Sequence, residues 1–391
     1  MKDSLTNWIS HFYISKNEPC PCGSGKDYGS CCLNNKDKIR SKLPTEYYSV
    51  KLLGESLYRC CLHPDKANCD SAIKNAHALQ NHRILSKLSI DGHVWMLNFK
   101  KNPIIINYSK SDIDIIFEID KVSVNQATTS TCFCNRHDDL VFADIEKPGC
   151  DFDPGNDKQK FIFAYKAFIF EYYRHLIAIK TFQKQVKEIP SSLKKNEIIS
   201  YYREIQQKLV EMEYYKCFFD NGIMNTDYRG LETAVVEIPY EIKFANFACI
   251  SPEYDLNGKK VALIDKKSGR MKRVFLTIFP AESKSYIILS YLCEDRASFT
   301  EYKNQLLNKD QQIVKLYFNY MLPLYSENIV LSPRLWNAWD EDIKMAFTVL
   351  INSKGRQLEV FKKACSFSLH NLTKSRTNGY IGKSSKIDMF T

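Results

Sequence analysis

The period of hydrophobic and polar positions changes along this 391-residue chain. Alternating runs occur between residues 93 and 119, a spacing of three to four residues governs 161–220, and alternation returns from about residue 232. Alternation predicts strands, whereas spacing of three and four predicts helices. Because strands and helices occupy separate stretches, the pattern predicts the α+β class.

The central helical stretch predicts a hairpin of two helices. Residues 161–186 form a long apolar run that predicts a largely buried helix, and Pro190 marks its end. Residues 197–220 place apolar side chains on one face, which predicts a second helix. Two such helices joined by a short connection are expected to pack side by side.

The second alternating stretch predicts an antiparallel sheet followed by helices. The candidate strands are residues 235–250, 260–264, 273–279 and 285–292. Turn signals at Asn257-Gly258 and Ser268-Gly269 favour hairpins between neighbouring strands. Residues 299–325 and 336–350 then predict helices, and Ser332 is a candidate N-cap for the second.

These boundaries suggest an order of domains. The segments are a zinc module and linker at 1–44, a second Cys/His-rich zinc domain at 45–150, a helical hairpin at 151–230, an antiparallel sheet plus helices at 231–350, and a basic tail at 351–391. A composition of 44% hydrophobic and 13% aromatic residues indicates folded domains with a core.

Composition and motifs also narrow the classes of protein. No run approaches 18 apolar residues, so no membrane span is expected, and the N-terminus lacks an apolar signal core, so we expect a cytoplasmic location. The chain contains no P-loop, GxGxxG or GxSxG motif, which gives no case for an NTPase, dinucleotide enzyme or serine hydrolase.

The net charge of +10 has one concentrated source near the C-terminus. Residues 361–387 hold Lys and Arg but no acid, and they include Phe367 and Tyr380. This mixture suits a phosphate backbone, which predicts nucleic acid or another anionic partner. The alternative is an ordinary solvated face.

The strongest chemical signal lies near the N-terminus. Cys20, Cys22, Cys31 and Cys32 form a C-x-C-x8-C-C pattern with glycines between the two pairs. Four thiolates so close together predict a tetrahedral Zn²⁺ site, and the glycines let the chain fold back on itself. A pair of disulfides is the alternative, which a reducing cytoplasm disfavours.

The same stretch, Asn17 to Leu33, resembles the SEC-C motif. The resemblance rests on Pro-Cys-Pro-Cys-Gly-Ser-Gly-Lys at 19–26, on Tyr28 and on the final Cys-Cys pair. SEC-C is the zinc-binding segment at the C-terminus of the SecA translocation ATPase, and it also occurs as a portable docking module. The resemblance implies zinc at the four cysteines and docking to a partner, and it covers a small part of the chain.

A second Cys/His cluster follows. Cys61 and Cys69 form a candidate knuckle, and Cys134 and His137 stand at i and i+3 where a helix is expected to begin. A knuckle, intervening strands and a helix start are the order that a treble-clef zinc site needs. Cys132 or His63 could replace one of these ligands, and the alternative to a zinc site is a set of buried thiols and a capped histidine.

This region also faintly resembles HNH (His-Me finger) nucleases. The resemblance implies His77 as general base, with Asn135 or His137 orienting or holding a Mg²⁺ or Mn²⁺ ion. The separation of His77 from Cys134 is longer than is usual in that family. Asp138, Asp139 and Glu146 are further candidate metal ligands.

Two functions from different classes follow from these patterns. The first is a zinc-binding protein that docks on nucleic acid or a protein partner through its SEC-C module and basic surface. The second is a metal-dependent nuclease that uses His77 and the Cys134–His137 region. A role in phage defence or stress response is a hypothesis from the unusual architecture.

Overall fold

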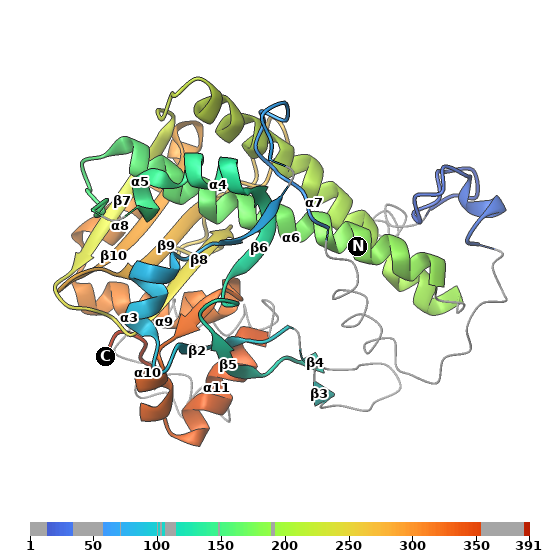
Figure 1. Cartoon of the computed structure of the whole chain (residues 1–391). Helices are drawn as coiled ribbons and strands as arrows, with labels where there is room; N and C mark the ends of the chain where they lie inside the picture. The colour runs from blue at the N-terminus through green and yellow to red at the C-terminus, as the bar shows by residue number, and fades with distance from the viewer. Residues whose placement is uncertain are drawn as a thin grey trace. The chain divides into compact units, whose positions relative to one another are not determined.

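The structure is a computed structural model that describes residues 14–33, 58–70, 72–99, 101, 104–105, 115–147, 149–188, 192–352 and 387–391. Its helices and antiparallel sheets confirm the predicted α+β class (Figure 1). By contacts the chain divides into two compact units. One unit comprises Met1–Arg59 with Glu171–Phe218, and the other comprises Cys60–Phe170 with Phe219–Thr391.

The second unit is built on a seven-stranded antiparallel sheet. In spatial order its strands are β5 Ile119–Ser123, β2 His93–Leu97, β11 Ile329–Leu331, β8 Phe244–Ile250, β9 Val274–Pro280, β10 Ser285–Leu292 and β7 Leu231–Ile238. The predicted hairpin of neighbouring strands holds for β9 and β10, but β7 pairs with β10 rather than with β8. The sheet is therefore antiparallel throughout without following chain order.

The expected strand at 235–250 is two strands. β7 ends at Ile238 and β8 begins at Phe244, and Pro239 is the first residue after the end of β7. Proline has no N–H to donate to a ladder, which explains why the strand ends there. The expected strand at 260–264 forms only isolated bridges, at Lys260 and at Ile264.

The sheet is buried on both faces. Every position of β8, β9 and β10 is buried, which is the pattern of strands covered on two sides. On one face, Leu276 and Ile278 belong to a core shared with the C-terminal helices. On the other, Phe275 contacts Phe168 at a ring-centroid distance of 6.2 Å.

The helices largely follow the predicted stretches but end differently. They are α6 Asp157–Glu188, α7 Ser192–Met224, α8 Arg296–Asn308, α9 Gln311–Tyr325, α10 Pro333–Ala338 and α11 Glu341–Asn352. Residues 299–325 divide at Asp310, whose side chain accepts a hydrogen bond from the Gln312 backbone N–H and so starts a new helix. Ser332 caps α10 in the same way, as predicted, but the expected helix at 336–350 is divided between α10 and α11. Among the described residues, no helix is long and apolar enough to cross a bilayer.

Residues from the expected Cys/His-rich domain join the same sheet as the later strands. β1 Ile73–His77 pairs with β6 Thr129–Cys134, and the chain between them supplies β2 and β5 to the seven-stranded sheet. A further short pair, β3 Ile104–Ile105 and β4 Ile115–Ile116, also lies in this insertion. β2 and β5, from the expected 45–150 domain, therefore share one sheet with strands of 231–350, which the expected domain order did not anticipate.

The end of the expected basic tail is part of the core. Ile387, Met389 and Phe390 are buried, and the Phe390 ring contacts Phe244 at 4.9 Å between centroids. The Tyr240 hydroxyl donates a hydrogen bond to the Phe390 carbonyl at 2.7 Å. The basic residues of 361–386 lie outside the described residues.

Candidate metal centres

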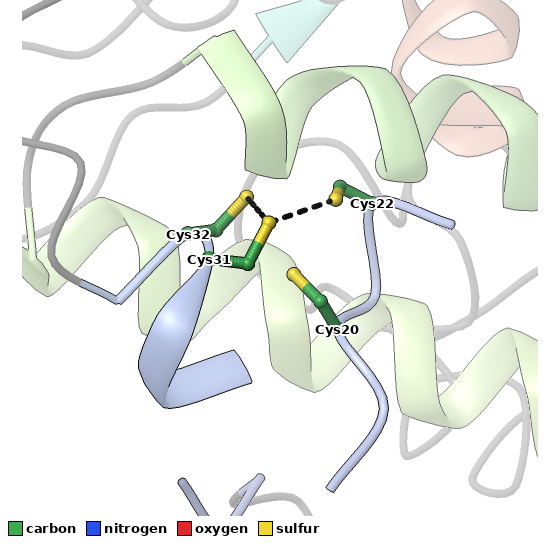
Figure 2. A group of neighbouring side chains, drawn as sticks. All are labelled: Cys20, Cys22, Cys31 and Cys32. Carbon is green, nitrogen blue, oxygen red and sulfur yellow. Dashed lines mark hydrogen bonds between the residues drawn. The ribbon is translucent and has the colours of Figure 1, made fainter. Parts of the chain in front are cut away.

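The four N-terminal cysteines converge on one point, as Figure 2 shows. The donor atoms of Cys20, Cys22, Cys31 and Cys32 all lie within 4.8 Å of one another. The Sγ atom of Cys31 is 3.6 Å from that of Cys22 and 3.9 Å from that of Cys32. We call this group the first centre.

These separations match a tetrahedral thiolate site and exclude disulfides. A Zn–S bond of about 2.3 Å places the sulfur atoms of a regular tetrahedron about 3.8 Å apart. A disulfide would bring two sulfur atoms to about 2.05 Å, and all four cysteines of this group are free. The first centre could therefore hold a metal ion, and its donor set is one that zinc prefers.

A tight loop brings the two cysteine pairs together. The backbone N–H of Cys20 donates to the Lys26 carbonyl at 2.7 Å, and that of Gly23 donates to the Cys20 carbonyl at 3.1 Å. Gly23 and Gly25 have φ of +75° and +74°, a conformation that glycine adopts without a Cβ clash. The short helix η1 Tyr28–Ser30 then turns the chain back toward Cys31.

Crowding sets the protonation of the thiols. Burial raises the pKa of Cys20, and burial with the neighbouring Cys20 raises the pKa of Cys32. Burial also acts to raise the pKa of Cys22, but hydrogen bonds with Ser24 and Cys20 outweigh it and lower that pKa to about 7. Closely spaced thiolates repel one another, so a bound cation favours their joint deprotonation.

The second centre combines three thiols with one imidazole. The Nδ1 atom of His137 lies 3.5 Å from the Sγ atoms of Cys61 and Cys69 and 3.2 Å from that of Cys134. Zinc bonds of about 2.3 Å to sulfur and about 2.0 Å to nitrogen place these atoms about 3.5 Å apart in a tetrahedron. All four donor atoms lie within 4.8 Å of one another, so this group could also hold a metal ion.

Local backbone pairing positions the ligands of the second centre. The segment beginning at Cys60 runs beside β6, where the Leu62 N–H donates to the Cys132 carbonyl at 2.8 Å. Cys134 ends β6, and His137 lies in the first turn of α4 Asn135–Val141. The Cys61–Cys69 segment, the antiparallel β1–β6 pair and α4 therefore follow one another in the order that the sequence predicts.

Two aspartates that the sequence reasoning did not single out shape this centre. Asp65 Oδ1 accepts a hydrogen bond from the Asn68 N–H at 3.3 Å, which closes the loop before Cys69. Asp70 Oδ2 accepts one from the Arg136 N–H at 2.8 Å and so caps α4. The feature of the sequence that could have indicated these two residues is the preference of aspartate for turns and helix starts.

The alternative ligands take other positions. His63 stacks on His137 with ring centroids 3.8 Å apart, and its Nδ1 accepts a hydrogen bond from the Asp65 N–H at 3.1 Å. Cys132 is fully buried, and its thiol is not one of the four donors that lie close together in the second centre. Both residues therefore surround the centre rather than complete its donor set.

Burial and local hydrogen bonds shift the pKa values of the second centre in both directions. Burial lowers the pKa of His137, so its imidazole is neutral at pH 7, as a ligand must be. Burial acts to raise the pKa of Cys134, but backbone hydrogen bonding near the start of α4 outweighs it and lowers that pKa. Burial and the adjacent Cys61 raise the pKa of Cys69 to about 11.

The structure places the two candidate catalytic residues apart. His77 ends β1 opposite Thr129, whereas Asn135 begins α4 next to the pairing of Ile73 with Cys134. Ile73 and His77 are four residue steps apart along β1, which is about 13 Å at about 3.3 Å per step. The Nε2 atom of His77 lies 3.1 Å from the Val124 carbonyl.

The candidate acidic ligands are engaged by lysines. Lys74 Nζ lies 2.9 Å from Asp138 Oδ2 and 2.8 Å from Asp139 Oδ1. Lys166, which is buried, forms an ion pair with Glu146. None of these three carboxylates is one of the four donors of the first centre or of the second centre.

Comparison with known proteins identifies the N-terminal segment. Residues 17–34 match the family model of the SEC-C motif. Neither the curated proteins nor the solved structures include a match to this chain. The chain therefore carries a SEC-C motif around its first centre, as its sequence predicts.

Proposed function

We propose that this chain is a zinc-binding protein in which both zinc ions are structural, and which docks on nucleic acid or a protein partner. The observation that carries the proposal is that each centre offers four protein donors at tetrahedral spacing. Catalytic zinc sites usually keep one position for water or substrate, whereas structural sites have four protein ligands. Bound zinc would supply cross-links between chain segments that have little core of their own.

The docking part of the proposal rests on the SEC-C motif and on charge. Residues 23–27, in the loop between the cysteine pairs, are exposed and include Lys26. The six Lys and Arg residues of 361–386 add positive charge without a compensating acid. An anionic partner would gain affinity from both, and the gain would fall as salt rises.

Binding of labelled nucleic acid at increasing salt tests this docking. The variant should replace the six basic residues of 361–386 with Gln but keep 387–391, because the last residues belong to the core. We expect a flatter dependence of log affinity on log salt than in the wild-type chain. An unchanged slope would show that these basic residues do not contact the nucleic acid. No binding by the wild-type chain would favour a protein partner, and loss of that partner in Lys26→Glu would then be the expected result.

A metal-dependent nuclease is a second candidate, favoured by the hydrogen bonding of His77. A carbonyl oxygen can only accept, so the contact with Val124 implies that Nε2 carries the proton and Nδ1 is the basic nitrogen. Burial lowers the pKa of His77, which keeps the imidazole neutral at pH 7. A neutral imidazole held in one tautomer is suited to act as a general base.

Cleavage assays on DNA and RNA with Mg²⁺ or Mn²⁺ test this candidate. His77→Ala should abolish cleavage while the protein keeps its zinc. His93→Ala is the matched control, because the Nδ1 atom of His93 lies 2.6 Å from the Asp91 carbonyl in the adjoining turn. Absence of cleavage by the wild-type chain with either ion would eliminate the nuclease.

A biological role in phage defence or stress response is a further proposal that rests on the same zinc chemistry. Cells that express the wild-type chain should resist phage or stress better than cells that express a variant lacking the first centre, such as Cys31→Ser. Equal survival would remove this role without affecting the biochemical proposal.

A further inference from the structure

The first centre shares a small core with the two long helices of its own unit. The SEC-C module, residues 17–33, contributes Cys20, Tyr28 and Cys32 to a buried cluster. Val186 of α6 and Ile199 of α7 complete this cluster. The two helix residues are only 0% and 3% exposed, so these apolar side chains are covered in the folded unit.

Polar contacts accompany this apolar contact. Glu18 forms an ion pair with Arg203 of α7. A Cβ built on Gly23 would lie 3.6 Å from the side-chain nitrogen of Gln183, so α6 approaches the loop between the cysteine pairs closely.

The size of the module gives these contacts their importance. Two of its three residues in the shared cluster are candidate metal ligands, so the module has almost no apolar core apart from the helices. Burial of Val186 and Ile199 is favourable because it removes their apolar surface from water. Metal binding and helix packing therefore depend on the same few residues.

We propose that the metal-loaded SEC-C module is a cap held in cis on the α6–α7 pair, with metal binding and packing linked. This proposal rests on zinc occupying the first centre. Loss of the metal would release the cap and expose Val186 and Ile199 to water. While the cap is in place, a partner in trans would meet the exposed loop at 23–27 and not the face that contains Tyr28.

Linkage predicts that helix substitutions weaken metal retention without touching a ligand. In Val186→Asp or Ile199→Asp, a charge would replace a buried apolar side chain, so we expect roughly tenfold or faster zinc release from the first centre to a competing chelator. Val210→Asp is the matched control, because Val210 is 73% exposed on the same α7. Release from the Val186 and Ile199 variants at the Val210→Asp rate would overturn the cap.

A charge swap tests the contact if the aspartate variants fail to fold. Glu18→Arg and Arg203→Glu should each speed zinc release by up to about fivefold, and the double variant should restore it. Hydrogen exchange supplies the reciprocal measurement, because Cys31→Ser should increase exchange around Val186 and Ile199. Independent effects of the two charge substitutions, together with unchanged exchange in Cys31→Ser, would contradict the cap.

These outcomes are separable from those of the proposed function. A purified chain with no zinc at the first centre would contradict the zinc proposal itself. A chain that binds zinc there but releases it at a rate insensitive to the helix substitutions would contradict only the cap.

Discussion

The Nδ1 atom of His137 lies 3.2 Å from the Sγ atom of Cys134, three residues earlier at the N-cap of α4. The same nitrogen, rather than Nε2, also faces the thiols of Cys61 and Cys69 at 3.5 Å. The start of α4 therefore supplies two of the four donors, and Cys61 and Cys69 supply the other two. This relationship makes the second centre a link between segments that are more than 60 residues apart in sequence.

Neighbouring cysteines provide a sharp test of that link. Cys61 belongs to the second centre and Cys60 does not, although they are adjacent in sequence. We expect Cys61→Ser to lower the free energy of unfolding of the second unit by several kcal/mol, because a broken structural zinc site removes binding energy from the fold. Chemical unfolding followed by circular dichroism measures this loss.

Cys60→Ser is the control for this prediction. The Cys60 thiol is not part of the group of four donors, and the Cys60 backbone N–H donates to the Thr131 carbonyl at 3.2 Å. Its substitution should cost much less than that of Cys61. Equal losses from the two substitutions would argue against a metal site at Cys61.

Glu232 should make the second unit sensitive to acid. Lys303 Nζ at 2.6 Å lowers the pKa of Glu232 to about 2, with Arg296 and the Tyr291 hydroxyl assisting against the effect of burial. The folded-state pKa lies below the ordinary 4.5, so the stabilisation is complete above about pH 4.5 and is lost as pH falls toward 2. After allowance for solvent screening, Glu232→Gln should cost about 1 kcal/mol at pH 7 and little at pH 2.

Urea unfolding at both pH values measures this difference. Glu237→Gln is the matched control on the same strand, because its pair with Lys284 is largely exposed. A cost for Glu232→Gln that is the same at pH 7 and pH 2 would contradict the role of the ionised carboxylate.

Gly222 marks the closest packing near the end of α7. A Cβ at this position would lie 2.4 Å from the Phe161 ring and 2.8 Å from the Asp227 carbonyl oxygen. Gly222→Ala should therefore destabilise the second unit by about 1–3 kcal/mol, although alanine favours helices. Thermal unfolding should show a lower Tm for this variant but not for Asn221→Ala, at the adjacent exposed position.

Local chemistry explains which features the sequence could predict. The two cysteine pairs of the SEC-C motif lie within one loop, so their spacing alone indicates a shared site. The helices α6 and α7 were predictable because long periodic stretches carry their own signal, and Ser332 was predictable because its capping hydrogen bond is local.

Features that depend on distant segments could not be predicted. The pairing of β11 with β2 and β8 joins short strands whose partners lie far away in sequence. The burial of Phe390 follows from its contact with Phe244, and no local pattern in a basic tail indicates it. The contact of Val186 and Ile199 with the SEC-C module is likewise set by tertiary packing.

Zinc stoichiometry tests the central claim most directly. Elemental analysis of the purified full-length chain should return two zinc ions per polypeptide, with one in Cys31→Ser, one in Cys61→Ser and none in the double variant. Much less than one zinc per wild-type chain, or an unchanged content in both single variants, would contradict the assignment of these two groups as zinc centres.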